Sequence, residues 1–392
     1  MARLTHEQLQ DVMNKYKVNE LWSWSKINCF LTSPYEYFLK YVLHKQGDCD
    51  NCAYAPIGGM VHSIIEKLYG GTIAYTDMSK EFESDWCVAI DIADLKFDRS
   101  DDNKNESIKR KYRCDLEHFF KNHTKIDTKV DIERFLSVKI GDYVLQGYAD
   151  AIIKDSDGCF NIIDWKTSTK YTGKSLEEHS GQLCVYAMAL MQLGVPLAKI
   201  RICFNFLKYV TVKYTQKNGS TKTRDIERCK IAESLQGSIR TWLREYGYDP
   251  DEYIDTLLDT NSLDFLPDEI KAMYTISDCY TYVPLTQELI DKWQKTITTT
   301  IDDIKFRERG YQETKSDKCF WDKEESVKNQ SYYFAVLCSY SPRLHLPYKS
   351  YLEKLEKAKS GVDLLGGGCD ELTESVTDTS DMSWLDEIFA EL

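Results

Sequence analysis

Apolar positions in the first part of the chain recur with the three- and four-residue spacing of helices that bury one face. From residue 129 onward this spacing gives way to β-rich runs. A return to helix is predicted at Leu176. We therefore expect helices over residues 5–17, 33–43, 57–69, 79–95 and 106–123, strands between 129 and 166, and a strand over 200–214. This order of elements fits an α/β (α+β) fold, in which a mixed central sheet is flanked by helices.

The later part of the chain is predicted to be mainly helical. Apolar spacing indicates helices over residues 224–246 and 286–307. Residues 261–267 and 280–284 are expected to be connections between elements.

Two predicted strands carry the acidic residues with the clearest chemistry. Residues 143–153 and 159–166 flank a turn, so they should form an antiparallel hairpin. Asp150 and Asp164 would lie side by side, and the two-residue period of a strand puts Asp164 and Lys166 on one face. Anionic oxygens hold a divalent cation and a nearby cation can place or activate water, as phosphodiester hydrolysis requires. An isolated Asp-x-Lys is more often a solvated ion pair, so its neighbours decide between the two interpretations.

Two helix patterns add polar residues to this region. Ser175 can cap a helix that carries Gln182 and Tyr186 four residues apart, hence on one face and over the same end of the sheet. Upstream, a short helix pattern ended by glycines carries His62 and Glu66, again four apart. An imidazole there could complete a metal site, although a lone helical histidine is more often a structural hydrogen-bonding residue.

Together these pieces resemble the PD-(D/E)XK nucleases, and within them the RecB-like branch found in helicase-nucleases, CRISPR-associated nucleases and phage exonucleases. The resemblance covers residues 21–214 and includes a helical segment over residues 23–38 that precedes the first motif. Each motif is weak alone, and their shared order makes the resemblance strong. In chain order, the motifs are Gly59-x-x-His62, Gly147-x-x-Asp150, Asp164-x-Lys166 and Gln182-x-x-x-Tyr186.

The resemblance implies a restriction-endonuclease-like fold, with an N-terminal helical segment and a C-terminal helical elaboration. It also implies that Mg²⁺ or Mn²⁺ is ligated by His62, Asp150, Asp164 and the backbone carbonyl of Trp165. Such an oxygen-rich set suits these ions better than a structural Zn²⁺.

Four further roles follow from the same resemblance. Lys166 would orient or activate the attacking water. Gln182 and Tyr186 would bind near the scissile phosphate or support the site. Glu133 could ligate a second metal, although an exposed strand glutamate is the commoner interpretation.

The cysteines set this chain apart from relatives that carry an iron–sulfur cluster. Ser33 stands where such proteins often place a cysteine before proline, and the late cysteines are not clustered. Cys49 and Cys52, with Cys29 and His44 nearby, form a pair without a clear second pair. The thirteen cysteines are scattered through helix and strand patterns. We therefore expect small core residues in a reducing cytosol, and no required zinc or iron–sulfur cluster.

The formal net charge of −13 must be weighed against its distribution. Residues 370–392 hold eight acids and no Lys or Arg, which leaves −13 + 8 = −5 for the rest. Residues 199–230 hold nine basic residues interleaved with aromatic ones. They could track phosphates and stack bases, or form a solvated hairpin around Asn218-Gly219. A second basic cluster over residues 104–113 could equally be a solvated helix face.

Domain organisation is expected to follow these patterns. Residues 1–56 would form an N-terminal helical segment, 57–230 the nuclease core, 231–360 a C-terminal helical lobe and 361–392 a flexible acidic tail. In the tail, Leu385, Ile388, Phe389 and Leu392 recur at helical spacing. The tail could dock on a protein partner, compete with DNA for the basic groove, or be a solubilising tail.

These observations predict a divalent-metal-dependent DNA exonuclease of recombination, repair or phage replication. A catalytically silent DNA-binding or assembly protein of the same fold, or an endonuclease, are the alternatives. The chain shows no apolar run of transmembrane length and no secretory core, so we expect a cytoplasmic protein of a bacterial or phage-infected cell. Strand polarity, DNA against RNA and oligomeric state are left open by the sequence.

Overall fold

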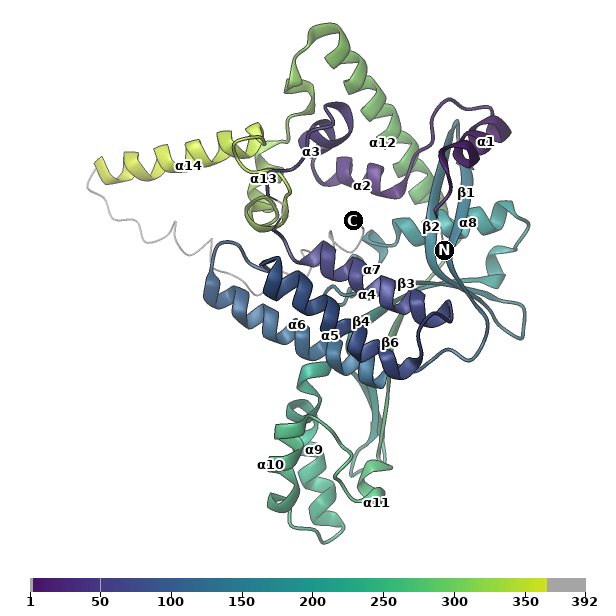
Figure 1. Cartoon of the computed structure of the whole chain (residues 1–392), viewed down its shortest axis with the longest axis vertical. Coiled ribbons are helices and arrows are strands. Elements are labelled where there is room, and N and C mark those ends of the chain that lie inside the picture. The colour runs from purple at the N-terminus through teal and green to yellow at the C-terminus, as the bar shows by residue number, and fades with distance from the viewer. Residues whose placement is uncertain (1–2, 50, 365–392) are drawn as a thin grey trace.

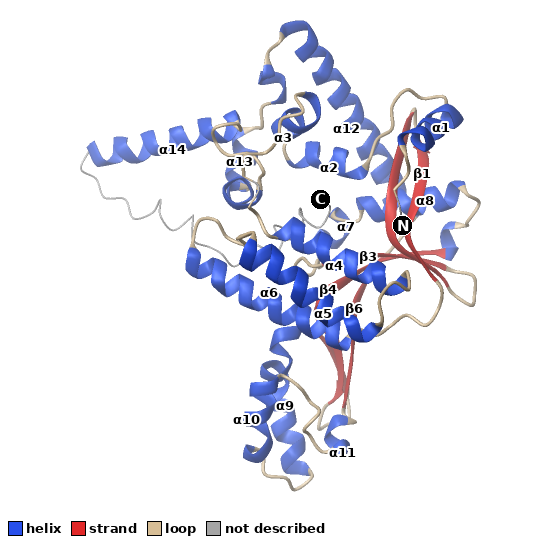
Figure 2. Ribbon diagram, viewed as in Figure 1, coloured by secondary structure: helices blue, strands red, loops and turns tan. Residues whose placement is uncertain are grey.

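A computed structural model describes residues 3–49 and 51–364 of the chain. Its centre is a six-stranded mixed sheet with the order β1-β2-β3-β4-β5, in which β6 also pairs with β4 (Figure 2). This architecture confirms the predicted fold class. The strands are β1 Val130–Ile140, β2 Tyr143–Lys154, β3 Phe160–Lys166, β4 Ile200–Thr215, β5 Thr221–Glu227 and β6 Tyr274–Val283.

The predicted acidic hairpin is confirmed as the β2–β3 pair. The strands run antiparallel, with Ala151 opposite Ile163, and Gly158 closes the turn at a φ of 78°. A positive φ is easy for glycine because it has no Cβ. The chain then crosses over the sheet, so that β3 and β4 are parallel.

The helices form two layers on the sheet and a separate group at one end. Helices α4, α5 and α6 cover one face, and α2, α8 and α12 pack against the other (Figure 1). The first group is α4 Tyr54–Tyr69, α5 Met78–Trp86 and α6 Asp102–Asn122; the second is α2 Trp24–Thr32, α8 Gly181–Gln192 and α12 Gln287–Thr314. The remaining helices are α1 His6–Tyr16, α3 Pro34–Tyr37, α7 Lys174–Glu178, α9 Ile231–Glu245, α10 Asp251–Thr260, α11 Asp268–Lys271, α13 Glu324–Asn329 and α14 Leu346–Leu364.

Helices α9, α10 and α11 pack on the far ends of β4, β5 and β6. Their buried residues form a hydrophobic cluster of their own, which includes Val212, Leu235 and Ile254. In Figure 1 this lobe projects below the sheet. The candidate site lies at the other end of the sheet, where α2, α4 and α8 meet β2 and β3.

Four short 3₁₀ turns are wound more tightly than an α-helix, and three π-helical segments are wound more widely. The 3₁₀ turns are η2 Tyr75–Asp77, η4 Leu197–Lys199, η5 Arg228–Lys230 and η6 Asp317–Phe320. Three π-helical segments are η1 Phe38–Val42, η3 Cys87–Ile92 and η7 Tyr333–Leu337. Segment η1 continues α3, so the helix predicted over 33–43 is present with a locally widened turn.

Three predictions about element boundaries are wrong. Ser175 does not cap the Gln182 helix, because the chain forms α7 and then α8, which begins after Ser180. A side chain at Gly181 would clash with the indole of Trp24, which explains why a glycine begins α8. Residues 224–227 belong to β5, which pairs with β4 in a hairpin, and residues 280–283 belong to β6, which pairs with β4 from far away in the sequence.

Segments from the early and late parts of the chain meet in a buried polar contact. Ser33 Oγ donates to Asp322 Oδ2 at 3.0 Å and lies 3.2 Å from His345 Nε2. The position where related proteins often carry a cysteine therefore holds a hydrogen-bonded serine. The acidic tail discussed above, from Gly366 to Leu392, lies outside the described residues. Within the described ranges, no helix has the length and apolarity needed to span a bilayer.

Candidate active site

Asp150 and Asp164 occupy opposite positions on neighbouring strands, immediately after the last paired residues Ala151 and Ile163. Asp150 Oδ2 accepts a hydrogen bond of 3.0 Å from the backbone N–H of Trp165. Lys166 Nζ lies 3.0 Å from Asp164 Oδ2. Asp150, Asp164 and Lys166 are only 8%, 4% and 2% exposed. The geometry therefore differs from a solvated Asp-x-Lys ion pair, which would lie in water.

The carboxyl group of Asp164 opposes the ionisation of Asp150. Burial raises the pKa of Asp150 well above its ordinary value, and the charge of Asp164 raises it further. The Trp165 N–H and the Lys166 ammonium act in the other direction. Asp164 Oδ2 is buried and, within the described residues, accepts no well-formed hydrogen bond despite its ion pair with Lys166. A site of this kind favours added positive charge near both carboxylates.

His62 reaches the same point from α4. Its Nε2 donates a hydrogen bond of 2.7 Å to the Trp165 carbonyl, and its Nδ1 lies 3.6 Å from Asp150 Oδ2. Burial lowers the pKa of His62, although the charge of Asp164 partly opposes this effect. The imidazole is therefore held in the neutral form that can ligate a metal.

Gln182 and Tyr186 share one face of α8, as their spacing predicts. Gln182 Nε2 donates to Tyr186 Oη at 3.2 Å, and Tyr186 Oη donates to the carbonyl of Tyr148 at 2.7 Å. Gly147 lies directly against this ring, since an added Cβ there would be 2.9 Å from Tyr186 Oη. The glycine of the second motif is thus explained by close approach between β2 and α8.

Glu133 faces the same region from β1. It lies between the pairs Ile132–Ala151 and Arg134–Ala149, so it is level with Asp150, and it has a positive φ of 47°. Burial raises the pKa of Glu133, and the charge of Glu66 on α4 raises it further. Glu66 was noted in the sequence only for its spacing from His62, and the structure adds it to the acidic group.

These side chains line one cavity of about 510 Å³. Lys166 is not among the lining residues, because it lies buried behind Asp164. Arg3, Lys40 and Tyr41 also line the cavity but were not predicted, because they lie outside the motifs and the 23–38 segment. The cavity brings together His62, Glu66, Glu133, Asp150, Asp164, Gln182 and Tyr186 with Arg3, Ser23, Ser25, Lys40, Tyr41 and Tyr148.

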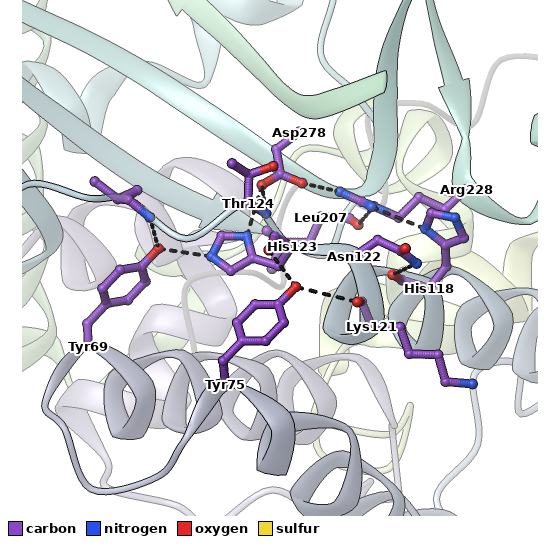
Figure 3. Close-up of polar contacts among 11 residues, drawn as sticks. Tyr69, Tyr75, His118, Lys121, Asn122, His123, Thr124, Leu207, Arg228 and Asp278 are labelled. Carbon is purple, nitrogen blue, oxygen red and sulfur yellow. Dashed lines mark hydrogen bonds and ion pairs between the residues drawn. The ribbon is translucent and has the colours of Figure 1, made fainter. Parts of the chain in front are cut away.

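A buried network supports the strand that carries the site. The indole of Trp165 stacks on Tyr69 at 6.1 Å, and Tyr69 Oη lies 2.9 Å from His123 Nε2. His123 Nδ1 lies 2.9 Å from Asp278 Oδ2, and Asp278 pairs in turn with Arg228 (Figure 3). The network links α4, α6, β6 and the start of the α9 lobe behind the β3 strand.

The donor set suits a hard divalent cation, although the side chains are not gathered around one. Across the described ranges, no three His, Cys, Asp or Glu side chains are placed so that they could hold a metal ion as they stand. His62 Nε2 and the Trp165 carbonyl instead satisfy each other. Two carboxylates, a carbonyl and a neutral imidazole are nevertheless ligands for Mg²⁺ or Mn²⁺, and the facing, buried carboxylates of Asp150 and Asp164 fit such an ion.

Most cations of the two basic stretches are already engaged. The 199–230 stretch does form a hairpin, with Gly219 at a φ of 80°. Arg201 pairs with Asp155, Lys217 with Glu245 and Lys230 with Glu227. Lys208 and Arg228 are buried. In the 104–113 cluster, Lys104, Lys109, Lys111 and Arg113 all have acidic partners.

The chain was compared with protein families, curated proteins and solved structures. The sequence matches the family model of the PD-(D/E)XK nuclease superfamily over residues 21–322. No curated protein matches the chain. Among solved structures, a crystal structure of SSO0001 is similar at 16% identity and a TM-score of 0.16, with 50% of this chain and 75% of that chain covered. The family model spans well over half of the sequence, including all four motifs, and the chain therefore belongs to the PD-(D/E)XK nuclease superfamily.

Proposed function

We propose that the chain is a Mg²⁺- or Mn²⁺-dependent DNA nuclease of the RecB-like branch, acting as an exonuclease in recombination, repair or phage replication. The observation that carries this proposal is the buried pair Asp150 and Asp164, which lines a cavity with His62 and has Lys166 beside Asp164. Two like charges are costly to bury together unless a cation neutralises them.

Each residue has a separate role in this proposal. His62, Asp150, Asp164 and the Trp165 carbonyl would hold the ion, and Glu133 would hold a second one. When bound, the ion polarises the phosphoryl oxygen and lowers the pKa of water. Lys166 would orient the attacking water from its place beside Asp164.

Gln182 and Tyr186 would position the substrate. Their hydrogen bonds fix the Tyr148 carbonyl two residues before Asp150, which supports the strand that carries the carboxylate. Gln182 Oε1 is buried without a hydrogen-bond partner among the described residues. It is therefore available to a group that enters the cavity.

The test is a cleavage assay with Asp164→Ala and Lys166→Ala. Each substitution should abolish cutting while DNA binding is largely retained, because phosphate contacts elsewhere supply most of the affinity. Asp142→Ala, in the exposed turn between β1 and β2, is the matched control and should cut normally. Cleavage by Asp164→Ala at the rate of the unmodified protein would overturn the proposal.

Substrate topology separates the alternatives. Linear end-labelled DNA and closed circular DNA, single- and double-stranded, are incubated with Mg²⁺, Mn²⁺ or EDTA. An exonuclease degrades only the linear forms, whereas an endonuclease also opens the circles. Binding without cleavage in the presence of either metal would favour a DNA-binding protein without nuclease activity. The complete set of Asp150, Asp164 and Lys166 argues against that alternative.

A further inference from the structure

The N-terminal residues contribute a cation to the candidate active site. Arg3 lines the cavity together with the acidic residues, and its side chain is exposed. No acidic group lies within 4.0 Å of it in the described structure. Among the lining residues that the structure describes, only Arg3 and Lys40 carry a permanent positive charge. A cation without an acidic partner, next to a cavity lined by carboxylates, can bind a phosphate group.

Tyr148 holds this segment in place. The backbone N–H of Leu4 donates a hydrogen bond of 2.7 Å to Tyr148 Oη, and the Arg3 guanidinium lies 5.7 Å from the centre of the same ring. Tyr148 is two residues before Asp150 on β2, so the position of Arg3 is set by the strand that carries the site.

Helix α1 anchors the segment from its other side. Thr5 and Gln8 form a capping box, in which each side chain bonds the backbone of the other residue. Tyr16 Oη, at the end of α1, lies 3.3 Å from Ser137 Oγ on β1. Residues 3–5 therefore run between two points that are both fixed to the β1–β2 hairpin.

Arg3 lines the same cavity as Glu133 and Asp150, so a phosphate that approaches these carboxylates would also meet the Arg3 guanidinium.

A cavity of about 510 Å³ has room for a segment of one DNA strand beside the carboxylates that line it.

We propose that Arg3, held on Tyr148, binds a backbone phosphate next to the scissile one in a single DNA strand that enters the cavity. This inference rests on the proposed nuclease function. Lys40, on η1, is the second cation of the lining and would contact another phosphate of the same strand.

The test compares Arg3→Gln and Arg3→Lys with the unmodified protein. Binding of fluorescein-labelled oligo(dT) is measured by anisotropy in EDTA over a series of salt concentrations. Arg3→Gln should weaken binding about tenfold, as for the loss of one charge-assisted hydrogen bond. It should also reduce the slope of log affinity against log salt by about 0.7, the value for one phosphate of a single strand. Arg3→Lys should keep the slope.

Two further variants separate the phosphate contact from other effects. Tyr148→Phe keeps the ring and removes the hydroxyl that holds Leu4, so it should weaken oligo(dT) binding less than Arg3→Gln does. Arg244→Gln, an exposed cation on α9 outside the cavity lining, is the matched control and should change neither affinity nor slope.

Kinetics and metal titration complete the test. Arg3→Gln should raise KM for a single strand and leave kcat and the half-saturating Mn²⁺ concentration unchanged. A raised Mn²⁺ requirement with an unchanged KM would instead place the effect on Glu133 and overturn the proposal. Unchanged affinity and salt slope would also overturn it. If the unmodified protein binds oligo(dT) but never cuts, the proposed function fails while the Arg3 contact can still be judged from binding.

Discussion

Gly147→Ala is expected to destabilise the protein through one specific clash with Tyr186. The added methyl carbon would lie 2.9 Å from Tyr186 Oη and 3.1 Å from its Cε1. Tyr186 is only 5% exposed and its hydroxyl donates to the Tyr148 carbonyl at 2.7 Å, so the ring cannot move without losing that bond. Overpacking a core costs about 1–3 kcal/mol, and a lost hydrogen bond costs about 1 kcal/mol. We therefore expect the free energy of unfolding to fall by about 2–4 kcal/mol.

Urea unfolding followed by tryptophan fluorescence measures this loss, and a second background isolates its cause. In a Tyr186→Phe protein the closest atom is gone and the nearest remaining contacts are 3.1 and 3.4 Å. Gly147→Ala should then cost about 1–2 kcal/mol less than in the unmodified protein. Gly59→Ala is the matched control, since nothing lies within 4 Å of its added methyl group and it sits within α4. An equal cost of Gly147→Ala in both backgrounds would refute the assignment of the clash to Tyr186.

Three further outcomes are expected. Asp150→Asn removes one of two facing buried charges, so it should raise the melting temperature measured in EDTA. Mn²⁺ should raise the melting temperature of this variant less than that of the unmodified protein. A lower melting temperature in EDTA would contradict the electrostatic account. Although burial opposes it, His123 and Arg228 hold the pKa of Asp278 below its ordinary value. The ionised Asp278 therefore stabilises the fold at pH values above its ordinary pKa of about 4, and this stabilisation is lost as the pH falls through the lowered pKa. In urea unfolding at a series of pH values, Asp278→Asn should reduce the loss of stability on the acid side. An unchanged dependence of stability on pH would contradict this role of Asp278. Deletion of residues 369–392 should speed cutting at low salt if the acidic tail competes with DNA. If the tail docks on a partner protein, the deletion should abolish pull-down of that partner and leave cutting unchanged. If the tail only solubilises the protein, both cutting and pull-down should stay unchanged.

Local patterns predicted the parts of the site that are close in sequence. The turn at Gly158 and the two-residue period of the strands were sufficient to place Asp150 beside Asp164. The four-residue spacing of Gln182 and Tyr186 likewise predicted their shared face on α8. In both cases the geometry depends on torsions and spacing within a few residues, which a sequence displays directly.

Long-range contacts were the parts that the sequence could not reveal. Strand β6 pairs with β4 across about sixty residues of intervening chain, and its alternation was too weak to distinguish it from a connection. The acidic neighbour of Glu133 and the cation at Arg3 come from α4 and from the segment before α1. The local spacing of Glu66 and Arg3 does not indicate that both lie near β2, because their positions depend on how α4 and the segment before α1 pack on the sheet.

The distribution of charge also limits how this protein can hold DNA. Its net charge is −13, and most cations of its two basic stretches already have acidic partners. Affinity must then depend on a few local contacts, such as those of Arg3 and Lys40, and less on a broad positive surface. Each phosphate contact on a single strand contributes about 0.7 to the slope of log affinity against log salt. With these two contacts we expect a shallow slope of about 1.4 for oligo(dT). A slope near that of a protein with six or more phosphate contacts would mean that lysines of the basic stretches break their ion pairs and bind DNA phosphates. The ion pairs of the free protein would then not describe its DNA-bound state.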